Sequence, residues 1–361
     1  MRVGMTLPAM APFAGTEQLL ALYEQSGFDS YWAPDHLLGV FHPRLWPDIA
    51  LSALGPDPDA FYDPFCYGAR LSTVTNLPYG ISVTDATRRG AADLARSALT
   101  LNDLLPGGFI LGIGSGEAES LLPFGYAFDK PVSMLEDVLG DLRHLFDTGR
   151  MPSGTGRMGL PLEAEGRGRP AVWVAGHGPR MLRLTGQYGD GWIPAWSMSP
   201  EEYGEKLGVV AAHAEAAGRP KPVASMLRFT LFAESVERAA EMFEAAPLAK
   251  LFGLFATGPM WEAEGLVHPL GETSKGFIDV VIHDLDADDL RDLAPTIPFE
   301  MVQRVLCIGN ADELGRQFGE YAKAGMEHMV LANITGLVGG MDEIMARAHE
   351  LPILKATLSD L

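Results

Sequence analysis

Short apolar runs alternate along this chain with longer segments of helical periodicity, and this alternation constrains the fold more than any other feature. Such alternation is typical of βα units built around a parallel sheet. The runs that we interpret as buried strands are residues 2–7, 30–33, 76–83, 108–113, 171–175, 192–194, 224–232 and 328–331. Eight βα units are what a closed (β/α)₈ TIM barrel requires, and 361 residues suffice once insertions are allowed. A doubly wound sheet is the competing interpretation, but it needs fewer strands and a clear switch point.

Helices are expected between these strands. The first segment of helical period begins near Thr16 and ends at Gly27. The others span about 90–104, 131–147, 178–188, 200–217, 235–246 and 311–324. Gly27 stands where a helix commonly ends in a left-handed residue, and Pro131 suits a first helical turn. We therefore expect one barrel domain over residues 1–361.

Two insertions interrupt the repeat, at about 39–75 and 247–300. The first contains five prolines and several aromatic residues, and the second carries His268 and an acidic run over 284–292. Both follow predicted strands, so they are expected at the C-terminal rim, where barrel active sites lie. They could form a substrate lid or a subunit interface, and the sequence leaves both open.

The charge balance narrows the possible partners. Lys and Arg number 27 against 47 Asp and Glu, a formal net charge of −20. Such a field repels nucleic acid and anionic membrane surfaces. Cys66 and Cys307 form no disulfide framework, and neither a signal peptide nor an 18-residue apolar span is visible. We expect a cytoplasmic protein with a small-molecule substrate, no nucleic-acid or membrane partner, and assembly as a homodimer.

Asp35 and His36 directly follow the second predicted strand. Histidine has the unperturbed pKa nearest neutrality, and a neighbouring carboxylate can orient it as an acid or base. A structural histidine bonded to backbone would look the same in the sequence. The position on the expected catalytic rim favours a catalytic role.

A glycine-rich stretch, 110–117, ends the fourth strand as ILGIGSGE. It lacks the dinucleotide fingerprint G-x-G-x-x-G, because Glu117 occupies the sixth position. Its glycines allow a flat ring to approach the backbone, or simply a tight turn. Glu117 could then reach such a ring, or it could be an ordinary solvated rim residue.

A second glycine-rich turn, 175–180, opens a helix directly after the fifth strand. Its unpaired N–H groups, with Arg180 and Arg183, predict an anion site, and Arg88–Arg89 suggest a second cationic patch. The alternative is that these arginines form ordinary surface ion pairs. If the site exists, its ligand carries phosphate or carboxylate.

Several chemistries lack their usual motifs. The nine histidines form no H-x-H or H-E-x-x-H pattern, so we expect no metal site. The nucleophile elbow G-x-S-x-G and the phosphate loop G-x-x-x-x-G-K-[ST] are also missing, which removes support for hydrolase and kinase functions.

Several sequence blocks of this chain resemble those of the bacterial luciferase-like superfamily, and within it the branch that uses the deazaflavin coenzyme F420. The similarity is carried by DSYWAPDHL, ISVTDATRR, ILGIGSGE, DKPV, VWVAGHGPRMLR and GDGWIP, dense over residues 29–195, and it extends to the phthiodiolone ketoreductase type. Sugar-phosphate dehydrogenases of this branch carry a tryptophan four residues after the histidine. Here that residue is Val40, and Trp46 lies further along, which puts a sugar-phosphate substrate in doubt.

The resemblance implies a barrel that holds the deazaflavin at its C-terminal mouth, with a non-prolyl cis peptide at Ser82–Val83 supporting the ring. It implies catalytic roles for His36, on the substrate oxygen, and for Glu117, near the pyrimidine edge of the coenzyme. The residues expected to bind the cofactor are Asp35, Ser82, Val83, Thr84, Gly114, Ser115, Gly116, Gly176, His177, Gly178, Pro179 and Arg180.

The function expected from this resemblance is F420-dependent hydride transfer between the deazaflavin and a carbonyl or alcohol. The aromatic insertions favour an apolar or polyketide-like substrate, as for a ketoreductase. One alternative is an FMN-dependent monooxygenase of the same superfamily. Another, of a different class, is a flavin-binding protein without turnover.

Overall fold

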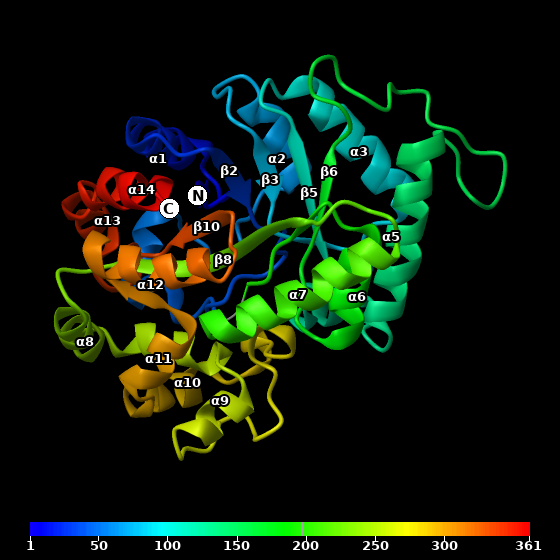
Figure 1. The fold of residues 1–361 in the computed structure, drawn as a ribbon. Helices are drawn as coiled ribbons and strands as arrows, with labels where there is room; N and C mark the ends of the chain where they lie inside the picture. The colour runs from blue at the N-terminus through cyan, green and yellow to red at the C-terminus, as the bar shows by residue number, and fades with distance from the viewer. Residues whose placement is uncertain (196–197) are drawn as a thin grey trace.

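The computed structural model describes residues 1–195 and 198–361, and within them eight parallel strands close into a barrel (Figure 1). The barrel strands are β1 (Arg2–Thr6), β2 (Ser30–Ala33), β3 (Tyr79–Ile81), β5 (Phe109–Gly114), β6 (Ala171–Val174), β7 (Gly191–Trp192), β8 (Val223–Phe232) and β10 (His328–Asn333). Closure follows from β10, which pairs in parallel with both β1 and β8. The predicted (β/α)₈ fold is therefore confirmed.

Two strand predictions needed correction. The expected strand 76–83 is shorter, because β3 ends at Ile81, the Ser82–Val83 peptide is cis, and the chain resumes as β4 (Thr84–Asp85) beside β5. An unforeseen strand, β9 (Cys307–Gly309), pairs with the last three residues of β8. The second insertion thus returns to the barrel at the end of the strand from which it departs.

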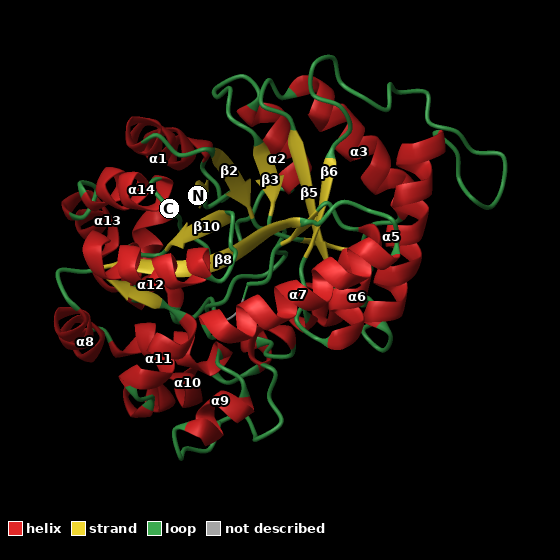
Figure 2. Cartoon of the chain, in the orientation of Figure 1, coloured by secondary structure: helices red, strands yellow, loops and turns green. Residues whose placement is uncertain are grey.

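Helices surround the sheet, as Figure 2 shows. The longer ones are α1 (Phe13–Ser26), α3 (Ala91–Leu104), α5 (Pro131–Thr148), α6 (Pro179–Tyr188), α7 (Pro200–Ala216), α8 (Val236–Ala245), α12 (Ala311–Lys323), α13 (Gly336–Ala346) and α14 (Glu350–Ser359). Local chemistry sets their ends: Gly27 ends α1 with φ 73°, and Asn310 and Glu313 form a capping box at the start of α12.

Shorter helical segments fill the connections. The α-helices among them are α2 (Pro64–Leu71), α4 (Ala118–Leu121), α9 (Gly258–Ala263), α10 (Ala287–Leu293) and α11 (Phe299–Val305). The 3₁₀ segments are η1 (Trp46–Asp48), η2 (Ala50–Leu54), η3 (Leu122–Phe124), η4 (Pro247–Phe255), η5 (Gly276–Ile278), η6 (Ile282–Asp284) and η7 (Ala294–Thr296). Among the described residues, no helix is both long enough and apolar enough to cross a bilayer.

Buried apolar side chains gather in separate clusters. The largest lies between the strands and the outer helices, and a small one fills the barrel interior around Trp32 and Trp173. A third cluster joins the two insertions, with Phe41 and Trp46 of the first packed among residues of the second. The insertions follow β2 and β8 at the C-terminal rim, where α9, α10 and α11 lie together in Figure 1.

Candidate active site

His36 lies just beyond the C-terminal end of β2, with a quarter of its side chain exposed. Its Nδ1 is 2.5 Å from Oε1 of Glu119, which belongs to α4 and is buried. Oε2 of Glu117 lies 4.0 Å from the same nitrogen, so the structure brings the two predicted catalytic residues together. The prediction that Asp35 orients His36 is wrong, because Glu119 is the carboxylate bonded to the ring.

Asp35 instead belongs to a buried ionic network below the site. The Thr84 hydroxyl donates to its Oδ2 at 2.6 Å, and Arg88 and Arg89 approach its carboxylate at 3.4 and 3.3 Å. Arg88 also bonds to Asp85. The predicted cationic patch at Arg88–Arg89 is therefore wrong, since carboxylates from other segments neutralise both guanidinium groups.

The site holds protons more tightly than free side chains would. Burial alone would lower the pKa of His36, but Glu119, Glu117 and Asp35 outweigh it and raise the pKa to about 9. Burial raises the pKa of Glu117 to about 7, against the opposing effects of His36 and Arg88. At neutral pH the imidazole is therefore a cation, and the site can donate a proton to an oxygen that becomes negative.

The glycines of β5 allow the segment beyond β3 to press against the strand. A Cβ on Gly112 would lie 1.9 Å from the carbonyl oxygen of Ile81 and 3.0 Å from Val83 Cγ1. The Ser82 hydroxyl is buried there, without a hydrogen-bond partner in the described residues. An orphaned hydroxyl beside an apolar side chain fits one face of a polar heterocycle. Gly114, Ser115 and Gly116 continue from β5 toward Glu117, and Gly116 turns the chain with φ 90°.

The glycine-rich turn after β6 does open a helix, as predicted. Gly178 precedes the first turn of α6 and Pro179 begins it, which leaves early N–H groups of the helix for an anion. His177 beside them is half-buried, and desolvation lowers its pKa to about 3, so the ring is neutral.

The arginines of that turn are already paired. Arg180 and Arg183 contact the two carboxylate oxygens of Glu136, on α5, at 2.5 and 2.9 Å. The structure brings the two arginines together around a single carboxylate, which offsets only one of their two positive charges.

Three donor atoms could in principle surround a metal ion. Those of His36, Glu117 and Glu119 lie within 4.8 Å of one another. His36 and Glu119 are, however, already bonded directly to each other, so the arrangement is that of a proton-sharing pair.

The aromatic residues of the first insertion serve the core more than the site. Phe41, Trp46 and Tyr67 are each 3% exposed, and the indole of Trp46 donates to the Gly55 carbonyl. Phe61 is the exception, since its ring centroid lies 5.7 Å from that of His36. One apolar ring therefore borders the candidate acid.

His268, the histidine noted in the second insertion, has a structural role. Its Nε2 bonds to the Leu254 carbonyl and its Nδ1 accepts the Leu270 N–H, both at 3.0 Å. Both ring nitrogens are occupied, so His268 is no substitute for His36.

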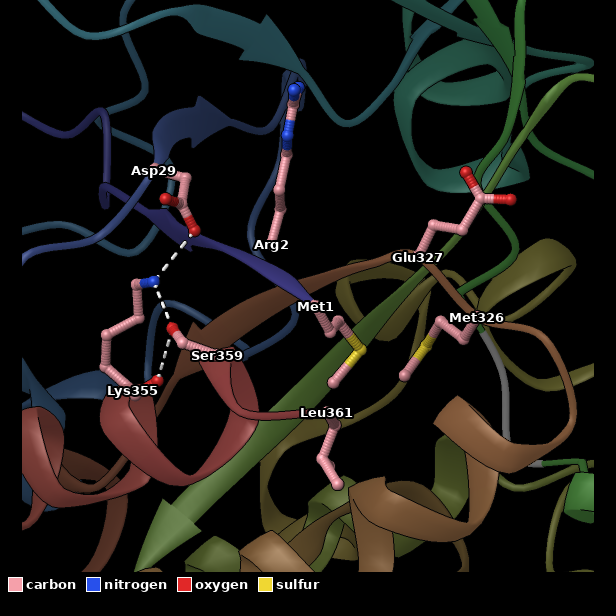
Figure 3. A pocket seen from close by; sticks show the side chains of 8 residues that line it. All are labelled: Met1, Arg2, Asp29, Met326, Glu327, Lys355, Ser359 and Leu361. Carbon is pink, nitrogen blue, oxygen red and sulfur yellow. Dashed lines mark hydrogen bonds and ion pairs between the residues drawn. The ribbon is translucent and has the colours of Figure 1, made fainter.

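The hollow in Figure 3 lies at the other end of the barrel. It encloses about 480 Å³ beside Arg2 at the start of β1 and Glu327 just before β10. Lys355 bonds there to Asp29 at 3.0 Å and to Ser359 at 2.6 Å. Lys355 and Asp29 thus form an ion pair within the hollow, and the hollow is separate from the candidate active site.

The profile of the luciferase-like monooxygenase family matches residues 1–328, which include the candidate site and the barrel strands from β1 to β8. The chain belongs to this family. The resemblance seen in the sequence motifs is thereby confirmed. A curated relative of this luciferase-like protein, the phthiodiolone/phenolphthiodiolone dimycocerosates ketoreductase of Mycobacterium sp. strain JLS, is 33% identical over 93% of this chain and 92% of its own.

Solved structures share the fold of this luciferase-like chain. An F420-dependent secondary alcohol dehydrogenase in complex with an F420–acetone adduct has a TM-score of 0.69 at 17% identity, covering 98% of this chain and 99% of its own. The oxygenating constituent of an FMN-bound 3,6-diketocamphane monooxygenase from Pseudomonas putida has a TM-score of 0.65 at 16% identity, covering 100% of this chain and 98% of its own. Both cofactor types thus occur on this fold.

Proposed function

We propose that this luciferase-like protein is an F420-dependent oxidoreductase that reduces the carbonyl group of an apolar substrate, or oxidises the corresponding alcohol. The position of His36, whose Nδ1 is 2.5 Å from Glu119 and 4.0 Å from Glu117 at the mouth of the barrel, is the observation that carries the proposal. The 33% identity to a ketoreductase supports a carbonyl as the reacting group of the substrate. Phe61 beside His36 supports an apolar substrate. Trp46 is buried, so it does not replace the tryptophan that the sugar-phosphate dehydrogenases carry four residues after the histidine.

The cofactor would supply hydride from carbon 5 of its deazaflavin. His36 would hold the substrate oxygen and give it a proton from Nε2, because negative charge develops there as hydride arrives. Glu117, with a pKa of about 7, would take up or release a proton beside the ring edge. Val83 and the Ser82 hydroxyl would support the ring, and the first N–H groups of α6 would bind the phosphate.

The first prediction separates the two cofactors. Purified protein should bind F420 at least roughly tenfold more tightly than FMN, a difference of about 1.4 kcal/mol. Fluorescence titrations with both cofactors measure it, and reduced F420 with a panel of long-chain ketones then tests turnover. Tight binding of FMN without binding of F420 would assign the chain to the monooxygenase alternative. Binding of F420 without turnover of any ketone or secondary alcohol would favour the non-catalytic alternative.

A second prediction concerns the turn at α6. Arg180→Ala should weaken F420 binding by roughly 1 kcal/mol, because an exposed guanidinium gains little from pairing with an anion. Glu136→Gln should strengthen binding, since it frees Arg180 and Arg183 from their present partner. Calorimetry at low ionic strength suits both variants, because salt screens exposed charges. Equal affinities in wild type and both variants would remove these side chains from the cofactor site.

A further inference from the structure

We propose that Glu119 is the positioning residue of this site: it holds His36 in the doubly protonated state and directs its Nε2–H to the substrate oxygen. This inference rests on the proposed function, and it adds a residue that the sequence motifs did not indicate. It also gives the resting enzyme a bias toward proton donation, which is the role required for carbonyl reduction.

The geometry of the pair supports this role. Nδ1 of His36 donates to Oε1 of Glu119 over 2.5 Å, a length typical of a strong charge-assisted bond. The Glu119 side chain is only 2% exposed, so water does not compete for its oxygen. Within the described residues Nε2 makes no hydrogen bond, which leaves it available at the exposed side of the ring.

Helix α4, which contains Glu119, packs against the segment that contains His36. Helix α4 begins directly after Glu117, and its Ser120 hydroxyl accepts the Leu37 N–H at 3.2 Å. Two contacts, one charged and one neutral, therefore join α4 to residues 36–37. They can be removed one at a time, which separates a loss of charge from a loss of docking.

The surrounding charges favour a protonated His36. The carboxylates that face it are Glu119 on α4, Glu117 before α4 and Asp35 after β2. Ion pairs with Arg88 and Arg89 offset the negative charge of Asp35. Glu119 is therefore the carboxylate that lies closest to the His36 ring and has the least compensated charge. Their combined effect exceeds that of burial and raises the pKa of His36 to about 9. The neutral imidazole, which alcohol oxidation would need as a base, is therefore scarce below this pH.

The test compares Glu119→Gln with Ser120→Ala in the full-length protein. Gln retains an acceptor oxygen for Nδ1–H but removes the charge, so the pKa of His36 should fall by at least one pH unit. Ser120→Ala removes the docking bond and should leave that pKa unchanged. NMR titration of the histidine ring signals measures it, with His36→Ala identifying the resonance, and no cofactor is needed.

Single-turnover reduction of a ketone provides the kinetic readout. In wild type the rate should decrease as the pH rises through about 9, because the imidazolium is lost. In Glu119→Gln this decrease should begin at least one pH unit lower, and Glu119→Asp should restore part of the difference.

An unchanged titration of His36 in folded Glu119→Gln would overturn the inference. So would an equal shift in Ser120→Ala, since docking alone would then explain it. If Glu119→Gln does not fold, the Glu119→Asp titration decides, and the pKa of His36 must then fall below its wild-type value. Failure to bind F420 would reject the proposed function and leave the NMR result standing.

Discussion

His36→Ala is expected to lower the maximal rate of hydride transfer by about 10²- to 10⁴-fold, the usual contribution of general acid catalysis. The imidazolium stabilises negative charge that appears on the substrate oxygen only in the transition state. The dissociation constant of F420 should stay nearly unchanged, because the proposed supports of the ring and phosphate are Val83 and the turn at α6. Binding titrations and single-turnover kinetics measure the two quantities separately.

The matched control for this variant is His42→Ala. His42 lies in the first insertion, and its ring stacks on His283 with a centroid separation of 6.2 Å. Within the part of the chain that the structure describes, no hydrogen bond, ion pair or ring contact joins His42 to His36, so its removal should leave the rate at the wild-type level. Wild-type hydride transfer by His36→Ala would make His36 structural. The acid would then be sought at Glu117, because both nitrogens of His268 are occupied.

Gly112→Ala is expected to damage both the fold and the cofactor site. Its methyl group would lie 1.9 Å from the Ile81 carbonyl oxygen, which is backbone and cannot turn aside. Overpacking of this kind typically costs about 1–3 kcal/mol, and the contact is severe enough to place this variant at the upper end. The segment through Val83 would have to move, so F420 affinity should fall together with the melting temperature.

A glycine with free space around it provides the comparison. Gly208 is an exposed position within α7, and a Cβ there meets nothing within 4 Å. Gly208→Ala should stabilise the protein by about 0.5–1 kcal/mol, because alanine is the better helix former. Thermal unfolding of both variants and F420 titration of Gly112→Ala check these expectations. Normal stability and normal F420 affinity in Gly112→Ala would show that β5 does not constrain the proposed ring support.

Strand positions were predictable because each barrel strand is a compact apolar run flanked by helical segments. The interval 30–33 agrees with β2 at both ends, and 108–113 agrees with β5 to one residue. The interval 76–83 was too long, since its apolar pattern continues through Val83 although the pairing with β2 stops at Ile81. The strand β9 was missed because three residues, Cys307–Gly309, are too few to show a period.

The site was predictable only in part, for a related reason. His36 and Glu117 each follow a barrel strand directly, and strands of a closed parallel barrel deliver such residues to one rim. Glu119 belongs to a helix of four residues, which has no recognisable periodicity, and it lies 83 positions from His36. The ion pairs of the arginines could not be predicted because several of their partners are distant in the sequence, such as Glu136, which is 44 positions before Arg180.

The core that the two insertions share makes them one structural unit. Arg44 pairs with Asp288 and Arg291 with Asp48, so charged contacts as well as apolar packing join segments more than 200 positions apart. A recombination event that replaced one insertion alone would break both kinds of contact. Exchange of both together would keep them, while the barrel interior remained untouched. A chimaera that exchanges the rim above the barrel mouth should therefore carry both segments from the same parent.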